Sequence, residues 1–98
     1  MMKMDDTLVK EAHVLLHPIR YRIVELLSEN PLHINAISKA MGAERRLVSY
    51  HLDTLEEHEF LTSKYEISEQ PKSKGKAIRI YKTTDKVKAV IDEIKKTL

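Results

Sequence analysis

Apolar residues recur every three or four positions along the chain as far as Phe60, which is the spacing of amphipathic helices. A first helix is expected after Asp5 or Asp6, since either carboxylate can accept a hydrogen bond from the first helical turn. Pro18 interrupts this pattern and fits the first turn of a second helix, because a proline there loses no helical hydrogen bond. Pro31 then ends the second helix.

The next apolar stretch predicts two helices separated by a tight turn. The third helix is expected to begin near Asn35, a good capping residue, and Gly42 is expected to stop it. The fourth lies within "MGAERRLVSYHLDTLEEHEFL", residues 41–61. A short helix, a glycine turn and a second helix form the pattern of a helix-turn-helix.

Beyond Phe60, apolar and polar residues alternate, which is the period of a β-strand. Residues 61–67 and 77–83 show this alternation, and "EQPKSKGK" between them contains the proline and the glycine of a long turn. From about Thr84 the spacing is helical again. The predicted fold is therefore mostly α with a small β-hairpin (α+β), a single domain over residues 1–98 in the order α-α-α-α-β-β-α.

Composition narrows the chemistry. The chain has 98 residues and a net charge of +2 although 33% of its residues are charged, so any basic surface requires the charges to be segregated. There is no cysteine, which excludes disulfides and thiolate metal sites. The sequence shows no signal peptide and no apolar run near the roughly 20 residues of a membrane span. We therefore expect a soluble, cytoplasmic protein without membrane contact and without a cofactor.

The fourth helix carries its charges against its own dipole. Arg45 and Arg46 stand at its start. Its acidic residues all stand toward its end: Asp53, Glu56, Glu57 and Glu59. The dipole favours the opposite order by about 0.3–1 kcal/mol per charge. A helix that enters the major groove of DNA leads with its N-terminal turns, so cations there and anions behind them suit that position. Alternatively, both arginines pair with acids elsewhere in the chain.

One face of this helix has side chains suited to DNA. A helical wheel places on the apolar side Leu47, Val48, Leu52 and Leu55. On the polar side it places Arg45, Arg46, Ser49 and Tyr50. Arginine matches the major-groove edge of guanine or a phosphate, serine a base edge or a phosphate, and tyrosine a sugar or a thymine methyl. These four polar residues are the predicted contacts in the groove.

The turn between the two predicted strands is a second candidate contact. Its cations, with the one just beyond it, are Lys72, Lys74, Lys76 and Arg79, and Glu69 is the only acid in that stretch. Beside a helix in the groove, such a loop can lie along the flanking phosphates of the DNA backbone. A disordered lysine-rich turn would have the same sequence, but the combination with a helix-turn-helix favours the DNA contact.

The histidines and the acidic run carry less information. His13 and His17 are four residues apart and could share a helix face, as zinc ligands do, but Pro18 breaks the helix and no third ligand is near. We expect no metal site. His51 falls on the apolar side of its helix, which indicates a partly buried structural histidine, with a phosphate contact as the alternative. Acids on a helix end without a pocket are typical of a solvated face, so no enzyme activity is expected.

The last predicted helix has a continuous apolar stripe, which consists of Val87, Val90, Ile91, Ile94 and Leu98. This stripe can simply cover the core of its own domain. Alternatively, it packs against a second copy together with residues of the first helix, which are Leu8, Ala12, Leu15 and Leu16. We favour the homodimer, because two reading helices about 34 Å apart meet successive turns of the major groove.

The segment "HPIRYRIVELLSENPLHINAISKAMGAERRLVSYHLDTLEEHEFL" resembles the core of an ArsR-type winged-helix regulator. The resemblance lies in Pro18 and Arg20, in the Ile-Val-Glu-Leu-Leu run that follows them, and in the Val-Ser-Tyr-His-Leu run. It implies that residues 36–41 support the turn, that 44–58 read DNA and that 61–83 form the wing. It also implies that the first and last helices build a homodimer.

Two departures from that family's pattern stand out. The family's metal-sensing cysteines would fall near His33 and Asn35, and the final helix has Asp92 and Glu93 but lacks the histidine ligands of a second metal site. Glu44 stands where a serine or threonine usually caps the reading helix. Metal sensing at those positions is not expected, and the sequence identifies no small-molecule effector.

The sequence therefore predicts a transcriptional regulator that binds double-stranded DNA sequence-specifically, as a homodimer and as a repressor on a near-palindromic operator. Two other classes of function remain open. One is an architectural protein that coats DNA without regard to sequence. The other is a winged helix that binds another protein through its hairpin.

Overall fold

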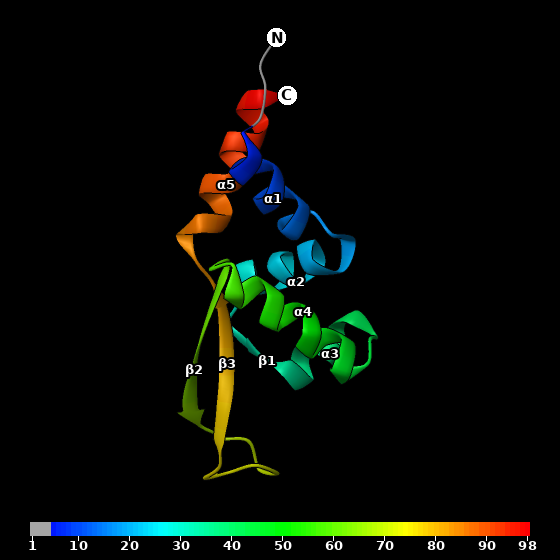
Figure 1. Ribbon diagram of the computed structural model, residues 1–98. Coiled ribbons are helices and arrows are strands. Elements are labelled where there is room, and N and C mark those ends of the chain that lie inside the picture. The colour runs from blue at the N-terminus through cyan, green and yellow to red at the C-terminus, as the bar shows by residue number, and fades with distance from the viewer. Residues whose placement is uncertain (1–4) are drawn as a thin grey trace.

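The computed structural model describes residues 5–98, and the elements in this part of the chain are five helices and three strands. In chain order they are α1 (Asp6–Leu15), α2 (Pro18–Glu29), β1 (Leu32–His33), α3 (Ile34–Met41), α4 (Arg45–Glu57), β2 (Leu61–Ile67), β3 (Ala77–Thr83) and α5 (Asp85–Thr97) (Figure 1). The predicted mostly helical fold with a β-hairpin is confirmed. The short strand β1 is absent from the predicted order.

The elements form an elongated body of 56 × 23 × 20 Å. Helices α1 and α5 pack side by side at one end, and α2, α3 and α4 form the middle (Figure 1). The hairpin of β2 and β3 extends to the other end, where residues 68–76 form its tip. We call residues 61–83, the hairpin with its tip, the wing.

The first two helices begin as the sequence predicts. Asp5 caps α1, since its carboxylate accepts a hydrogen bond from the Leu8 amide at 2.7 Å. Pro18 occupies the first turn of α2 after the capping residue His17. Asn30 follows the last residue of α2 in an extended conformation, which continues into the proline that ends the helix.

The boundaries of α3 differ in part from the prediction. The capping residue is His33 and not Asn35, because Nδ1 of His33 accepts a hydrogen bond from the Asn35 amide at 3.2 Å. An imidazole nitrogen thus performs the role that the sequence analysis gave to an amide oxygen. Gly42 ends α3 as predicted, in the left-handed conformation with φ of +62°. The next amide, that of Ala43, donates to the carbonyl of Ser38 at 3.1 Å.

The strands form one antiparallel sheet in the order β1-β3-β2. Strands β2 and β3 pair along their whole length, from Leu61 opposite Thr83 to Ile67 opposite Ala77. Strand β1 has only two residues and pairs with the middle of β3. Because β1 runs directly into α3, it joins the helix-turn-helix to the wing by backbone hydrogen bonds.

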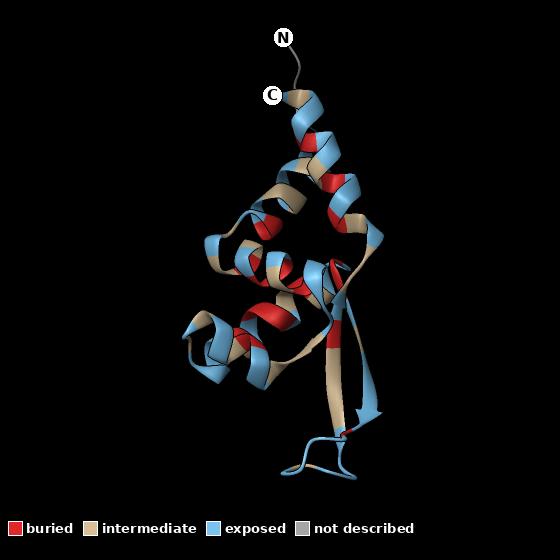
Figure 2. Cartoon of the chain, turned by 180° about the vertical axis from the view of Figure 1, so that it is seen from behind, coloured by how far each residue is buried: buried red, intermediate tan, exposed pale blue. Residues whose placement is uncertain are grey.

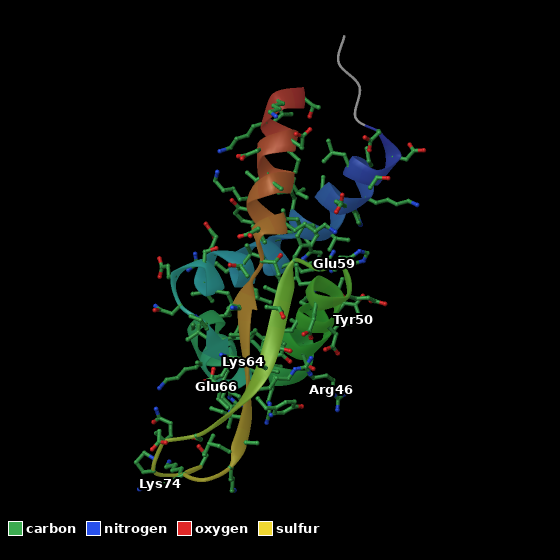
Figure 3. All side chains as sticks on the ribbon, turned by 90° about the vertical axis from the view of Figure 1, so that its left-hand side faces the viewer. Arg46, Tyr50, Glu59, Lys64, Glu66 and Lys74 are labelled. Carbon is green, nitrogen blue, oxygen red and sulfur yellow. The ribbon has the colours of Figure 1, made fainter. Side chains whose placement is uncertain are left out.

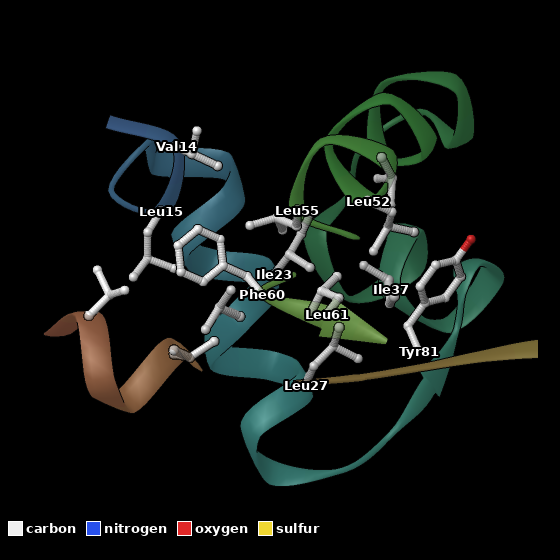
Figure 4. Packing of buried hydrophobic residues seen from close by; sticks show 14 of the residues in the cluster. Val14, Leu15, Ile23, Leu27, Ile37, Leu52, Leu55, Phe60, Leu61 and Tyr81 are labelled. Carbon is white, nitrogen blue, oxygen red and sulfur yellow. The ribbon is translucent and has the colours of Figure 1, made fainter. Parts of the chain in front are cut away.

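A single cluster of apolar side chains connects the helices to the root of the wing (Figure 4). Its fully buried members are Leu15, Ile23, Ile37, Val48, Leu52, Leu55 and Phe60. Val48, Leu52 and Leu55 form the inner face of α4. Burial of each of these side chains stabilises the fold by about 1.5–3 kcal/mol. Leu47, which the wheel placed with them, is 41% exposed instead. Its side chain points about 100° away from that of Val48, beyond the edge of the buried stripe.

Helix α4 ends in a turn that few residue types favour. Glu59 has a φ of +65°, and the Phe60 amide donates to the Leu55 carbonyl at 2.9 Å. This pattern reverses the chain at the helix end and places the ring of Phe60, which is fully buried, in the core. The chain then enters β2, so this turn sets where the wing begins.

Candidate nucleic-acid interface

The outer face of α4 presents the four residues predicted to contact bases. Arg45, Arg46 and Tyr50 are exposed, with Tyr50 at 62%, and Ser49 is half-buried. Figure 3 shows Arg46 and Tyr50 along α4 and Lys74 at the far tip of the wing. Within residues 5–98, neither arginine forms an ion pair. The alternative that these arginines neutralise acids of their own chain is therefore wrong for the described residues.

The first turn of α4 lacks the usual stabilisation of a helix start. Glu44 is the capping residue, and its side chain makes no capping hydrogen bond. The first turn has no acidic residue, while Arg45 and Arg46 lie at the positive end of the helix dipole. The start of α4 is thus electrostatically unfavourable in the isolated chain, and an external anion would relieve it.

His51 anchors the inner side of α4 to α2. Its side chain is buried, as the structural interpretation predicted, and its Nδ1 lies 3.2 Å from Nη1 of the buried Arg20. Because a guanidinium only donates, Nδ1 accepts and the ring proton resides on Nε2. The ring also lies 4.7 Å from that of His17, between centroids. Burial lowers the pKa of His51, and the neighbouring His17 and Arg20 lower this pKa further.

The tip of the wing is an ordered loop built around Ser68. Ser68 is buried, and its Oγ lies 2.6 Å from Oγ of Ser73. Oγ of Ser68 also accepts a hydrogen bond from the Gln70 amide at 3.1 Å. The Gly75 amide donates to the Ser68 carbonyl at 3.1 Å, with Gly75 at a φ of +84°. The loop exposes three cationic side chains, those of Lys72, Lys74 and Lys76. Hydrogen bonds thus define a loop that the sequence alone could not distinguish from a disordered turn.

Arg79 is separate from the three lysines. It lies in β3 opposite Tyr65, in the half of the strand nearer the tip. Its side chain reaches back toward α4, where Nη2 pairs with Oε1 of Glu56 and Nε donates to Oγ of Ser63 at 2.9 Å. Ser63 in turn donates to Oε2 of Glu56 at 2.6 Å. The sequence predicts that Glu56 belongs to a solvated acidic face, but the structure shows that it also has two partners in the wing. It contacts both strands of the wing.

His33 lies where β1, α3 and the start of α4 meet. Besides capping α3, it is close enough to Arg45 for that charge to act on it. Burial lowers the pKa of His33, and the charge of Arg45 lowers this pKa further. The neutral ring is the form that accepts the capping hydrogen bond, so the fold favours an uncharged His33.

The residues predicted to form a dimer divide into three groups by their burial. Four of them are buried in the core of their own chain, namely Leu15, Val87, Val90 and Ile94. Leu8, Ala12 and Ile91 are partly buried against that core, whereas Leu16 and Leu98 are 48% and 92% exposed. Val9, which the sequence analysis did not select, is 49% exposed. Buried positions recur along α5 between exposed and half-buried ones, whereas in α1 the buried positions are its last two residues (Figure 2).

Other kinds of site are not found in the described part of the chain. Within residues 5–98, no three histidine and acidic side chains are grouped so that they could hold a metal ion. None of the helices described there combines the length and the apolarity that a membrane crossing requires.

Three residues have structural contacts in the wing that the sequence does not predict: Glu56, Ser63 and Ser68. Serines in strands and turns are common, and a glutamate near a helix end is ordinary, so no local pattern marks them. The acid in α4 and the arginine in β3 are 23 residues apart, a pairing that only the folded chain reveals. A weak signal existed in Ser68, because serine favours turns whose backbone amides its hydroxyl can bind.

These elements define a winged helix-turn-helix, in which two helices joined by a tight turn are followed by a β-hairpin. Residues 15–64 match the family described as "Helix-turn-helix domain", and the chain belongs to this family. No curated protein matches the sequence. The following solved structures share this fold, and one of them is described as a possible ArsR-family transcriptional regulator.

The diamide-treated YodB of B. subtilis has a TM-score of 0.78 at 18% identity, over 97% of this chain and 89% of its own. Mb0332 of Mycobacterium bovis, a possible ArsR-family transcriptional regulator solved as a homodimeric winged helix-turn-helix DNA-binding domain, has a TM-score of 0.69 at 17% identity, over 97% and 87%. Reduced HlyU of Vibrio cholerae has a TM-score of 0.68 at 20% identity, over 88% and 82%. The TM-scores establish a shared fold, and at identities this low the likeness extends to the fold alone.

Proposed function

We propose that this protein is a regulator of transcription that binds double-stranded DNA sequence-specifically. Helix α4 enters the major groove, and the residues that face the bases are Arg45, Arg46, Ser49 and Tyr50. The lysines of the wing tip lie along the flanking phosphates. The observation that most supports this proposal is the absence of any ion pair of Arg45 or Arg46 within residues 5–98, in a helix turn that disfavours cations.

The energies involved favour an external anion as the reason for this charge order. Each arginine at the start of α4 costs about 0.3–1 kcal/mol against the helix dipole. One bidentate arginine–guanine contact contributes about 1–3 kcal/mol of discrimination between bases. Phosphate contacts add affinity through the release of counterions. The cost in the free protein is therefore smaller than the gain in a complex.

The functional unit is a homodimer that represses transcription in the cytoplasm by occupying a near-palindromic operator. Exposed apolar residues on these two helices support it: Val9 within α1, Leu16 at the end of α1, and Leu98 at the end of α5. The M. bovis domain of the same fold is described as homodimeric. In sedimentation experiments, Leu16→Asp should shift the chain toward monomer, whereas Leu47→Asp, an exposed leucine in α4, should leave the dimer intact. Equal dimerisation of both variants would place the interface elsewhere.

The test of DNA binding begins with selection of bound duplexes from a random pool, which also reports the symmetry of the site. On a selected duplex, Arg46→Ala should cost about 1–3 kcal/mol and relax the base preference, since alanine cannot form the bidentate hydrogen bonds to guanine. Lys74→Ala should weaken binding to all sequences alike and reduce the slope of log K against log salt by about 1. Lys64→Ala is the matched control, because Lys64 is an exposed wing lysine that pairs with Glu66 at 3.8 Å.

Each other result has a defined meaning. Equal behaviour of Arg46→Ala and Lys74→Ala contradicts the division between groove and backbone contacts. A specificity ratio near unity between selected and random duplexes indicates an architectural protein that coats DNA. Failure to shift any duplex at physiological salt, together with capture of a protein partner, indicates a protein-interaction module.

A further inference from the structure

Three side chains tie α4 to the root of the wing: Glu56, Ser63 and Arg79, which we call the wing-root cluster. Each member contacts the other two, so the cluster links one helix and both strands of the hairpin. The guanidinium of Arg79 also lies over the ring of Tyr81, with Cζ 5.0 Å from the centroid. Arg79 is thereby held by a carboxylate, a hydroxyl and an aromatic face.

The cluster is better shielded than an ordinary surface ion pair. The side chains of Arg79 and Glu56 are 37% and 27% exposed, whereas those of the Lys64–Glu66 pair on the same wing are 72% and 48% exposed. Charge-assisted hydrogen bonds in such a partly buried place are stronger and less screened by salt than exposed pairs. The cluster can therefore fix an angle between elements, which a fully exposed pair does poorly.

The position of the cluster along the hairpin lets it determine where the tip of the wing lies. Strand β1 pairs with β3 only at Ile80 and Tyr81, so beyond them the wing is a two-stranded ribbon without a third strand. Such ribbons twist and bend readily. Strand β2 continues from Ser63 to Ile67, about 13 Å, before the tip loop starts, and on β3 two residues, Ala77 and Ile78, lie between the loop and Arg79. A small change of angle at the root thus displaces the tip lysines by several ångströms.

We propose that the wing-root cluster positions the wing relative to α4, so that the tip lysines reach phosphates while α4 lies in the groove. Arg79 is then a positioning residue that acts through Glu56, and it is not itself a backbone contact, which revises the role expected from its sequence. This inference rests on the proposed DNA-binding function. It predicts that an acidic residue near the interface promotes binding to a polyanion.

The matched pair Glu56→Ala and Glu57→Ala tests this prediction. Both substitutions remove one carboxylate from the same turn of α4, and within residues 5–98 Glu57 is exposed and makes no ion pair or side-chain hydrogen bond. Loss of a negative charge near DNA should tighten binding slightly in Glu57→Ala. Glu56→Ala should instead weaken binding by about tenfold and lower the salt slope by about 1 for each phosphate that the wing no longer reaches. Tighter binding in both variants would overturn the proposal.

A double-mutant cycle attributes the effect to the wing tip. The fold-loss of affinity caused by Lys74→Ala should fall to less than half in the Glu56→Ala background, because the lysine of a misplaced wing no longer lies against a phosphate. In the Glu57→Ala background the fold-loss should be unchanged. An equal loss in all three backgrounds would overturn the proposal. Arg79→Lys keeps the charge but cannot bind both partners of Arg79, so it serves as a second variant if Glu56→Ala unfolds at the assay temperature.

A measurement without DNA separates this inference from the proposed function. The chain has no cysteine, so spin labels can be attached at Lys39→Cys in α3 and Lys74→Cys in the wing tip, both exposed positions. The distance distribution between the labels, measured in an excess of unlabelled chain, should broaden in Glu56→Ala and stay narrow in Glu57→Ala. Unchanged widths would overturn the positioning role. If the wild type bound no duplex, the proposed function would fail and the label distances would still judge the cluster.

Discussion

The two helices of the helix-turn-helix, α3 and α4, end in the same backbone geometry but with different residues. Gly42 follows α3 at a φ of +62°, and Glu59 follows α4 at a φ of +65°. A residue with a Cβ in this left-handed conformation costs about 1–2 kcal/mol, whereas glycine adopts it without strain. Adding a Cβ at position 42 and removing the side chain at position 59 should therefore change the free energy of unfolding in opposite directions.

The magnitudes follow from the surroundings of each residue. A Cβ at Gly42 would meet no atom within 4 Å, so Gly42→Ala adds backbone strain and no clash. About 0.4–1 kcal/mol of that strain is offset, because alanine restricts the unfolded chain. The net loss should be about 1 kcal/mol. Glu59 is exposed, and its side chain makes no ion pair within residues 5–98, so Glu59→Gly should gain about 1 kcal/mol.

Thermal or urea unfolding followed by circular dichroism, at one protein concentration, measures both changes. A shift of about 4–8 °C in Tm is expected per kcal/mol for a chain of this size. The double variant should resemble the wild type, because α4, with 13 residues and about 20 Å long, separates the two sites. A loss of stability in Glu59→Gly would refute the reasoning, since it would mean that the glutamate side chain contributes more than its backbone strain costs.

Three further predictions concern α4 and its supports. Leu52→Ala should lower the free energy of unfolding by about 2–5 kcal/mol, because this fully buried side chain leaves a cavity; a loss below 1 kcal/mol would contradict the described core. Burial and neighbouring charges lower the folded-state pKa of both His51 and His33. As the pH falls, the unfolded chain therefore takes up more protons at these two residues than the folded chain does. Stability should be complete above a pH of about 6.5 and fall below it, with each histidine adding at most about 1.4 kcal/mol per pH unit; His51→Leu should flatten this dependence, and an unchanged slope would argue against a neutral buried ring. Glu44→Ser should stabilise the protein by about 0.5–1 kcal/mol in the same unfolding assay by adding the missing cap, and no gain would indicate that the first turn is already satisfied.

The sequence predicts the helices well because their signals are local. Apolar spacing and the residues Asp5, Pro18 and Gly42 mark the boundaries that the structure confirms. Strand β1 could not be predicted, since two residues are too few for any alternation to show. It exists because Leu32 meets Tyr81, nearly fifty positions later, and this pairing depends on the path of the whole chain.

In the candidate site, too, local features could be predicted from the sequence and long-range contacts could not. The helical wheel correctly exposes Arg46 and Tyr50 and correctly buries His51, because a face of one helix is a local property. The partner of His51 is Arg20, 31 residues away, and only tertiary packing brings them together. Arg79 was grouped with the tip lysines for the same reason, since its proximity to Glu56 has no trace in the sequence around either residue.

The elongated outline of the molecule has a mechanical consequence. Helices α1 and α5 pack at one pole and the wing projects at the other, along a body 56 Å long and 23 Å wide (Figure 1). In a dimer formed through α1 and α5, the wing tips would lie far from the contact between the two copies. A small rotation of one copy relative to the other at that contact would therefore move the wing tips over a larger distance. Control exerted at that contact would change the spacing of the two distant ends without any bending of the bodies between them.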